Sequence, residues 1–206
     1  RCSATNRCMN SATATVTARS VPAAVAEFMH RFVAEHLAQH GGDAAHIAGH
    51  WRACGEWRHA GQSFVQAAQA ARAAALANEH AVLLDEAIAA FEHDPAAHDA
   101  LFDALAERAG AYESQGHEGL RPQLIQRLQA LARNEAQRLI ALNHHYGWLT
   151  NLAQAVDDAE ALAAIARART VARPDLAWEL ARMLGWQWAM NNRADEGLAL
   201  LLQHEP

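Results

Sequence analysis

The sequence predicts an all-α protein, and three observations support that fold class. Alanine, the strongest helix former, makes up roughly a quarter of the chain, well above its average share. Valine and isoleucine, which favour strands, are sparse. Apolar residues recur every three or four positions along successive segments, as on one face of a helix. With 51% hydrophobic and 6% aromatic residues, the 206-residue chain can form a core built mainly from alanine and leucine.

The first three helices begin and end at recognisable signals. Pro22 suits the first position of a helix, and the apolar pattern after it predicts a helix over 22–40 that a Gly-Gly pair ends. Asp43 can cap the next helix, which ends at Gly55. A long segment rich in small residues then predicts a helix over 56–77.

Seven further helices complete the chain, joined by connections of about two to six residues, as antiparallel helical hairpins require. Asn78 can cap the first of them and Pro95 ends it. Pro122 opens a later helix, and Asn134 marks a break. We expect these helices over residues 78–91, 96–115, 121–133, 135–153, 157–172, 175–190 and 193–204.

Residues on both sides of Gly55 form a repeat-like pattern. Large side chains alternate with small ones that allow helices to cross closely, in the order Ile47, Ala48, Trp51, Ala60, Phe64 and Ala67. This order and spacing resemble the tetratricopeptide repeat, a helical hairpin of about 34 residues. In this interpretation Cys54 is a small apolar residue before the turn and not a catalytic thiol.

Two further copies of the pattern are present. One closes the chain and consists of Leu184, Gly185, Trp188, Gly197 and Leu201, with His204 departing from the pattern. From Ala48 to Gly185 the two clear copies are offset by 137 residues, close to four periods of about 34. A weaker copy lies over 109–128, with Arg121 where a small residue is expected.

The repeats set the expected domain organisation. The resemblance implies a right-handed α-α superhelix of tetratricopeptide-like hairpins over 22–206, which continues beyond 206 in a parent protein. Residues 1–21 are rich in Ser, Thr, Ala and Asn and carry no acid. We expect them to be a disordered linker or the remnant of a preceding domain.

Residues 30–91 also resemble the segment that follows the ATPase module of large bacterial signalling ATPases, including LuxR/MalT-like transcriptional regulators. The resemblance rests on His30, Arg31, Ala34, Glu35, Leu37, His50, Trp51, Ala53 and Gly55. Cys54 stands where that family usually has alanine. The resemblance implies a non-enzymatic regulatory module that senses a protein, peptide or effector, or contacts the ATPase module of its own parent chain. It implies no cofactor.

Composition disfavours several other functions. All 17 basic residues are arginine, so no lysine is present for a Schiff base or a phosphate-binding loop. The net charge is −6, and the arginines are spread among acids, which argues against direct nucleic-acid binding. The chain contains no apolar run of about 18 residues that could span a membrane. Its 3 scattered cysteines fit a reduced, cytoplasmic protein.

The histidines supply the main alternative function. His36 and His40 form one pair four residues apart, and His46 and His50 form another on the next helix. Four imidazoles can bind a metal, so the alternative is a metal-dependent helical enzyme. No H-E-x-x-H motif accompanies the pairs, and we expect neither a metal site nor a catalytic residue. A stand-alone adaptor is a third possibility.

The expected binding surface is the concave face of the array, lined by the first helix of each hairpin. The repeat register places there Arg52, Asp103, Glu113, Glu179, Arg182, Trp186 and Met190. Two arginines against three acids argue against an adaptor that clamps a C-terminal carboxylate. Trp186 is the strongest candidate, because a tryptophan has little reason to face water unless it contacts a partner.

The last helix carries more leucine than one buried stripe can use. Leu198, Leu200, Leu201 and Leu202 lie within it. Since a repeat unit buries its apolar side on the next unit, we expect either a further repeat or a second copy of the chain to cover this surface. The sequence therefore predicts self-association through the C-terminal end.

Overall fold

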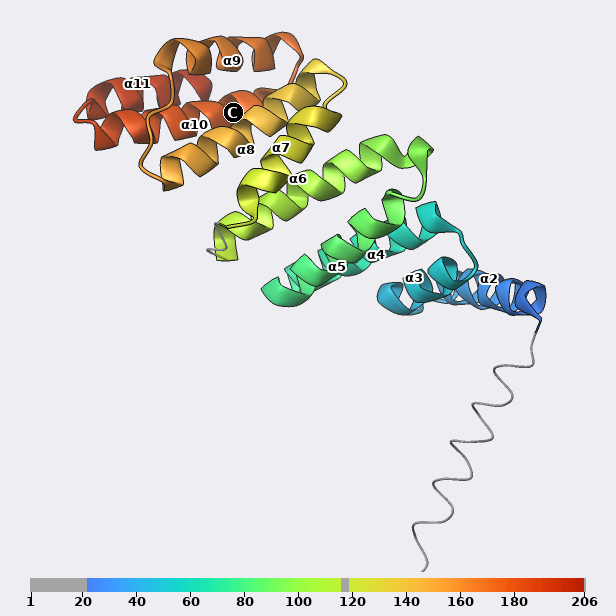
Figure 1. Ribbon diagram of the computed structural model, residues 1–206. Helices are drawn as coiled ribbons and strands as arrows, with labels where there is room; N and C mark the ends of the chain where they lie inside the picture. Colours follow the sequence, from blue (N-terminus) through green and yellow to red (C-terminus); the bar gives the residue numbers. More distant parts are fainter. Residues whose placement is uncertain (1–21, 116–118, 206) are drawn as a thin grey trace, which may run out of the picture.

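A computed structural model describes residues 22–115 and 119–205, apart from the side chains of 112–115. Within these residues the chain forms ten α-helices, one short 3-10 helix and no strand, so the all-α prediction is confirmed (Figure 1). The linker expected over 1–21 lies outside the described residues. The helices are α2 (Ala23–Gln39), α3 (Ala44–Ala53), α4 (Trp57–Ala73), α5 (Ala77–Phe91), η1 (Pro95–Ala97), α6 (His98–Gln115), α7 (Arg121–Leu131), α8 (Glu135–Asn151), α9 (Asp158–Thr170), α10 (Pro174–Met190) and α11 (Ala194–His204).

Most predicted boundary signals act as expected. The side chain of Asp43 accepts a hydrogen bond from the His46 amide at 2.8 Å, and Asn134 caps α8 in the same way. Asn78 is an exception, because it lies inside α5, whose N-cap residue is Leu76. In the described part of the chain, no helix combines the length and the apolar character needed to cross a membrane.

The helices follow one another in chain order and pack mostly as sequential antiparallel pairs (Figure 1). Two additional contacts join α6 to α8 and α8 to α10. One buried cluster extends from α3 to α8 and contains Phe64, Phe91 and Phe102. The other extends from α8 to α11 and contains Leu180 and Trp188. Because α8 contributes to both, it connects the two halves of the core.

The small residues that the repeat pattern singled out lie at helix crossings. Ala48 and Ala60 are both 0% exposed, where α3 crosses α4. Gly185 and Gly197 bring the backbones of α10 and α11 together, since a Cβ atom on Gly197 would lie 2.6 Å from the Gly185 carbonyl oxygen. The two hairpins expected at these positions are therefore confirmed as hairpins.

The regular spacing between the two hairpins is not seen. The 137-residue offset predicts four whole repeat units between the two copies. Because each unit has two helices, the first helix of one copy and the first helix of the other should be an even number of helices apart. In the structure α3 and α10 are seven helices apart. A single regular series of two-helix units therefore does not include both copies.

The weaker copy contains Arg121 at a position where the repeat pattern has a small residue. In the structure Arg121 is 0% exposed, so the position is buried although its side chain is large.

We expect Ala60→Leu to destabilise the protein and Ala73→Leu to leave its stability nearly unchanged. Ala60 has no room for added atoms at the α3–α4 crossing, and overpacking of this kind costs roughly 1–3 kcal/mol. Ala73 is exposed near the end of α4, where a leucine projects into solvent. Urea denaturation of the two variants measures the difference. Equal free energies of unfolding would show that the crossing adapts to the larger side chain.

Six helices end in the same backbone turn. Each is followed by a residue with positive φ, and the next amide donates a hydrogen bond of 2.8–3.0 Å back to the helix. The residues with positive φ are Gly41, Gly55, Ala75, Ala153, Ala172 and Asn192. The turn reverses the chain within a few residues, which places consecutive helices side by side as antiparallel pairs.

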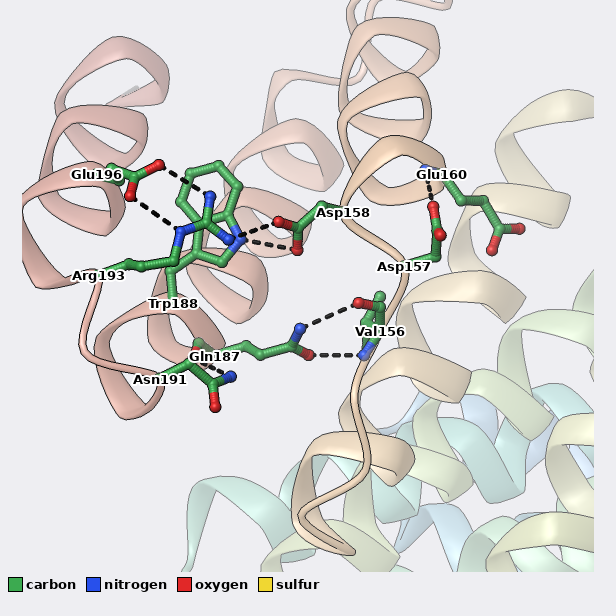
Figure 2. Close-up of polar contacts among 9 residues, drawn as sticks. All are labelled: Val156, Asp157, Asp158, Glu160, Gln187, Trp188, Asn191, Arg193 and Glu196. Carbon is green, nitrogen blue, oxygen red and sulfur yellow. Dashed lines mark hydrogen bonds and ion pairs between the residues drawn. The ribbon is translucent and has the colours of Figure 1, made fainter.

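A polar network fastens α9 to the last hairpin (Figure 2). Asp158 at the start of α9 accepts from Trp188 Nε1 at 2.8 Å and from Arg193 at 2.7 Å. These bonds lower the pKa of Asp158, with Arg193 the main cause. The side-chain amide of Gln187 bonds to both the N–H and the C=O of Val156. The connection before α9 is thereby held against α10.

Candidate functional site

The structure distributes the residues predicted for the concave face over separate surfaces. Arg52 on α3 forms an ion pair with Glu86 of α5. Asp103 lies on α6, and the side chain of Glu113 lies outside the described part of that helix. The remaining residues all belong to α10, namely Glu179, Arg182, Trp186 and Met190. Helix α3 packs on α2 and α4, whereas α10 packs on α8, α9 and α11. Arg52 and the α10 residues are therefore not neighbours.

The α10 residues form a stripe of their own. Arg182 donates to Glu179 at 2.7 Å, so two of the charges compensate each other. Trp186 and Met190, one turn apart, are 60% and 70% exposed. On α11, Leu200 is buried while Leu198 and Leu202 are exposed, as expected for a helix with more leucine than one stripe can bury. This end of the array thus presents apolar side chains to its surroundings.

The two histidine pairs seen in the sequence are in contact, and a further histidine joins one of them. The rings of His36 and His40 stack, and those of His46 and His50 lie 4.9 Å apart between centroids. In addition, Nδ1 of His50 lies 2.9 Å from Nδ1 of His30 on α2. Burial, followed by the nearby rings of His30 and His46, lowers the pKa of His50. No group of three or more His, Cys, Asp or Glu side chains in the described residues is arranged to hold a metal.

We expect the protein to bind Zn²⁺ no more tightly than micromolar, since a structural zinc site needs about four convergent ligands. Isothermal titration calorimetry of the full chain measures the affinity. His46→Ala/His50→Ala is the test variant, and His93→Ala, whose ring stacks on Trp57, is its control. Stoichiometric nanomolar binding that only the test variant loses would contradict this expectation and favour the metal-dependent alternative.

A groove lies between α4 and α6. Two adjoining cavities of about 530 and 760 Å³ lie along it, and Glu107 lines both. The first cavity is lined by Gln62, Val65, Gln66, Gln69, Phe91, Ala100, Asp103, Ala104 and Glu107. The second is lined by Arg72, Ala75, Ala77, His80, Ala106, Glu107, Gly110, Ala111 and His144. We call the two together the α4–α6 groove.

Helix α5 creates the groove because it packs against both of its walls. Gly61 of α4 lies directly on the Phe91 ring, and any Cβ atom there would clash with that ring. Phe91 is 2% exposed and also lines the groove floor. The buried face of α4 is built from alanine, glycine, phenylalanine and Ser63, whereas Gln62, Gln66 and Gln69 are exposed.

The two walls differ in chemistry. The α4 wall presents three exposed glutamines, Gln62, Gln66 and Gln69, spaced so that they share one helix face. The α6 wall presents Asp103 and, one turn later, Glu107. One wall therefore offers amides that both donate and accept hydrogen bonds, and the other offers carboxylates that only accept them.

The second cavity contains the partners of Glu107. His80 is 7% exposed and lies 3.0 Å from a Glu107 carboxylate oxygen through Nε2, and Arg72 reaches the same carboxylate at 3.4 Å. His144 of α8 closes this end of the groove. Burial, with a smaller contribution from Arg121, lowers the pKa of His144 to about 4, so its imidazole is neutral at pH 7.

Asp103 has unusual electrostatics. Partial desolvation, followed by the nearby carboxylate of Asp99, raises its pKa, against the opposing effect of Arg173. Other carboxylates, such as Asp94 and Asp175, have an arginine partner and a lowered pKa. Among the carboxylates the structure describes, Asp103 alone shows a raised pKa.

Of the residues predicted as binding residues, only Asp103 lines the α4–α6 groove. Sequence reasoning missed the glutamine stripe, His80 and His144. The glutamines had a detectable signal, because three amides at helical spacing interrupt a segment that is otherwise mostly alanine. His80 and His144 had none, since they come together only through the packing of three helices. No family model matches this chain, and no match was found among curated proteins or solved structures.

Proposed function

We propose that this chain is a non-enzymatic regulatory module that binds a segment of a protein partner. The observation that carries the proposal is the α4–α6 groove, which has polar walls on two helices and a floor closed by Phe91. An elongated concavity with hydrogen-bonding side chains along its length suits a chain-like ligand. No hydroxyl or thiol nucleophile is present among the described residues that line it, which favours binding over catalysis.

The proposal extends to the architecture and to the parent protein. We interpret the stacked hairpins as a tetratricopeptide-like superhelix whose alternation shifts between its two ends. The resemblance of residues 30–91 supports an origin in a cytoplasmic bacterial signalling ATPase or transcriptional regulator. Helix α2 supplies a surface for the ATPase module of the same chain, because four of its apolar residues are exposed: Val25, Phe28, Met29 and Phe32.

Selection from a library of random linear peptides tests the proposed function. The full chain is the target, and we expect peptides of about ten residues to be enriched and to bind at micromolar affinity or better. Hydrogen exchange of the complex then locates the bound peptide. Protection of the α4–α6 groove supports the proposal. Failure to enrich any peptide, or protection confined to α2 or α10, contradicts the assignment of the groove as the binding site.

We also expect the chain to self-associate through its C-terminal end. Leu198 and Leu202 are 57% and 64% exposed, and apolar surface of this kind favours association. Sedimentation velocity over a range of concentrations measures the effect. Leu198→Gln/Leu202→Gln should remain monomeric, whereas Phe28→Gln/Phe32→Gln on α2 should behave like the unmodified chain. A chain that is monomeric at every concentration is the contrary result.

A further inference from the structure

We propose that the occupant of the α4–α6 groove is an extended, basic segment of the partner, rich in arginine or lysine. This inference rests on the proposed function and specifies its ligand class. Three features of the groove carry it: the spacing of the side chains on its walls, the sign of the charge on its α6 wall, and the lack of an ion-pair partner for Asp103 among the described residues.

The first feature is that the spacing of the glutamines on α4 matches the spacing of backbone groups in an extended peptide. Gln62 and Gln66 are one helical turn apart, about 6 Å along the axis of α4. In an extended chain, backbone groups on the same side recur every two residues, about 6.7 Å. Each glutamine amide can donate to a peptide carbonyl and accept from a peptide N–H. The glutamines of the α4 wall can therefore form hydrogen bonds with the backbone along one edge of an extended segment, whatever the side chains of that segment.

The length of the groove sets the length of this segment. From Gln62 to Arg72 the α4 wall extends ten residues, about 15 Å along the helix axis. About four to five residues of extended chain cover that distance. Small residues such as Ala100 and Ala104 line the groove between its polar walls, so the backbone of the ligand can approach closely.

The second feature is the charge of the α6 wall. Asp103 and Glu107 lie one turn apart and face the same groove as the glutamines. A phosphate or an acidic side chain would be repelled by Asp103, and an apolar side chain would bury the Asp103 carboxylate without an ion-pair partner. A guanidinium or ammonium group is the complementary ligand, and an arginine can pair with a carboxylate through two hydrogen bonds.

The third feature is the charge environment of Asp103. No arginine or histidine in the described residues forms an ion pair with it, and Arg173, whose charge acts on Asp103 from a greater distance, is paired with Asp175. Glu107, by contrast, has Arg72 and His80 as partners. Desolvation, followed by the carboxylate of Asp99, raises the pKa of Asp103 despite the opposing effect of Arg173, so its charge is only partly compensated within the chain. A cation from the partner would supply the missing compensation.

Fluorescence anisotropy with three labelled peptides tests the inference. Each has about eight residues and alternates alanine with arginine, glutamine or glutamate, so that backbone length is constant and charge varies. We expect the arginine peptide to bind at least about tenfold more tightly than the glutamine peptide, and the glutamate peptide to bind most weakly. Added salt should reduce the affinity for the arginine peptide most.

Matched variants separate the groove from general attraction to an acidic protein. Asp103→Asn/Glu107→Gln should weaken the arginine peptide by about tenfold or more. Glu27→Gln/Asp195→Asn removes the same charge from exposed positions on α2 and α11 and should change affinity less than twofold. Asp103→Asn alone should raise the melting temperature while it lowers affinity, because it removes the repulsion with Asp99.

The outcomes distinguish the inference from the function on which it rests. If the arginine and glutamine peptides bind equally and both protect the groove from hydrogen exchange, the groove binds peptides and the basic specificity is wrong. If both double variants weaken the arginine peptide equally, the attraction is adventitious and the inference fails. If none of the three peptides binds while library selection yields peptides that protect the groove, the inference alone fails. An absence of binding in both experiments overturns the proposed function as well.

Discussion

Gly197→Ala is expected to destabilise the protein by roughly 3 kcal/mol, near the upper end of overpacking costs. The added Cβ atom would lie 2.6 Å from the Gly185 carbonyl oxygen and 3.3 Å from its carbonyl carbon. These are backbone atoms of α10, so no side-chain rotation relieves the clash and the two helices must move apart. The helix propensity gained by replacing glycine with alanine, about 1 kcal/mol, only partly offsets that effect.

The matched control is Gly49→Ala. Gly49 lies inside α3, and a Cβ atom there has no neighbour within 4 Å, so only the gain in helix propensity remains. We expect this variant to be more stable than the unmodified chain by about 0.5–1 kcal/mol. Gly185→Ala should be intermediate, because its Cβ atom would lie 3.1 Å from the Gly197 oxygen. Chemical denaturation measures all three. A Gly197→Ala variant as stable as Gly49→Ala would mean that α10 and α11 do not cross closely.

Acidification is expected to destabilise the fold, and His144 accounts for the largest part. The pKa of His144 is about 4 in the folded chain, against about 6.5 in an unfolded one. Below pH 6.5 the unfolded state therefore binds a proton that the folded state does not. The stability from burying this neutral ring is fully present above pH 6.5 and is lost as the pH falls toward 4, on the order of 3 kcal/mol.

Two other histidines act in the same direction, since burial lowers the pKa of His50 and of His204. The raised pKa of Asp103 opposes them, because protonating that carboxyl favours the folded state. Urea denaturation at about pH 7 and about pH 5 measures the sum. His144→Asn should remove most of the pH dependence, and His59→Gln at an exposed position of α4 should not. An unchanged pH dependence in His144→Asn would show that this ring is not the source.

The helices and their crossings could be predicted from the sequence because their causes are local. Proline, glycine and capping residues define helix ends, and the 3.6-residue period defines the buried face. Ala48, Ala60 and Gly185 could be assigned to crossings because small residues alternate with large ones at a spacing that two neighbouring helices alone determine. Each of these inferences needs only residues that are close in sequence.

The groove could not be predicted in the same way. Its width depends on how α4 and α6 are held apart by α5, which no local pattern records. An exposed stripe such as Gln62 and Gln66 has the same appearance in sequence as an ordinary solvated helix face. The contact between His30 and His50 is likewise tertiary, since twenty positions separate them. The register between the repeat copies failed for a related reason: an offset counted in residues does not specify how many helices the intervening chain forms.

The six shared turns have a mechanical consequence. Each fixes the angle between two helices through short backbone hydrogen bonds, so the joints after α2, α3, α4, α8, α9 and α10 resist bending. In the described residues, the joint between α5 and α6 and the joint between α7 and α8 do not show this turn. The first of these joints lies beside α6, one wall of the groove, and we expect it to bend more easily than the six that share the turn. A ligand that binds between α4 and α6 would therefore change the angle at this joint more than at those six. The helices before the groove and those after it would then rotate relative to each other as two rigid groups.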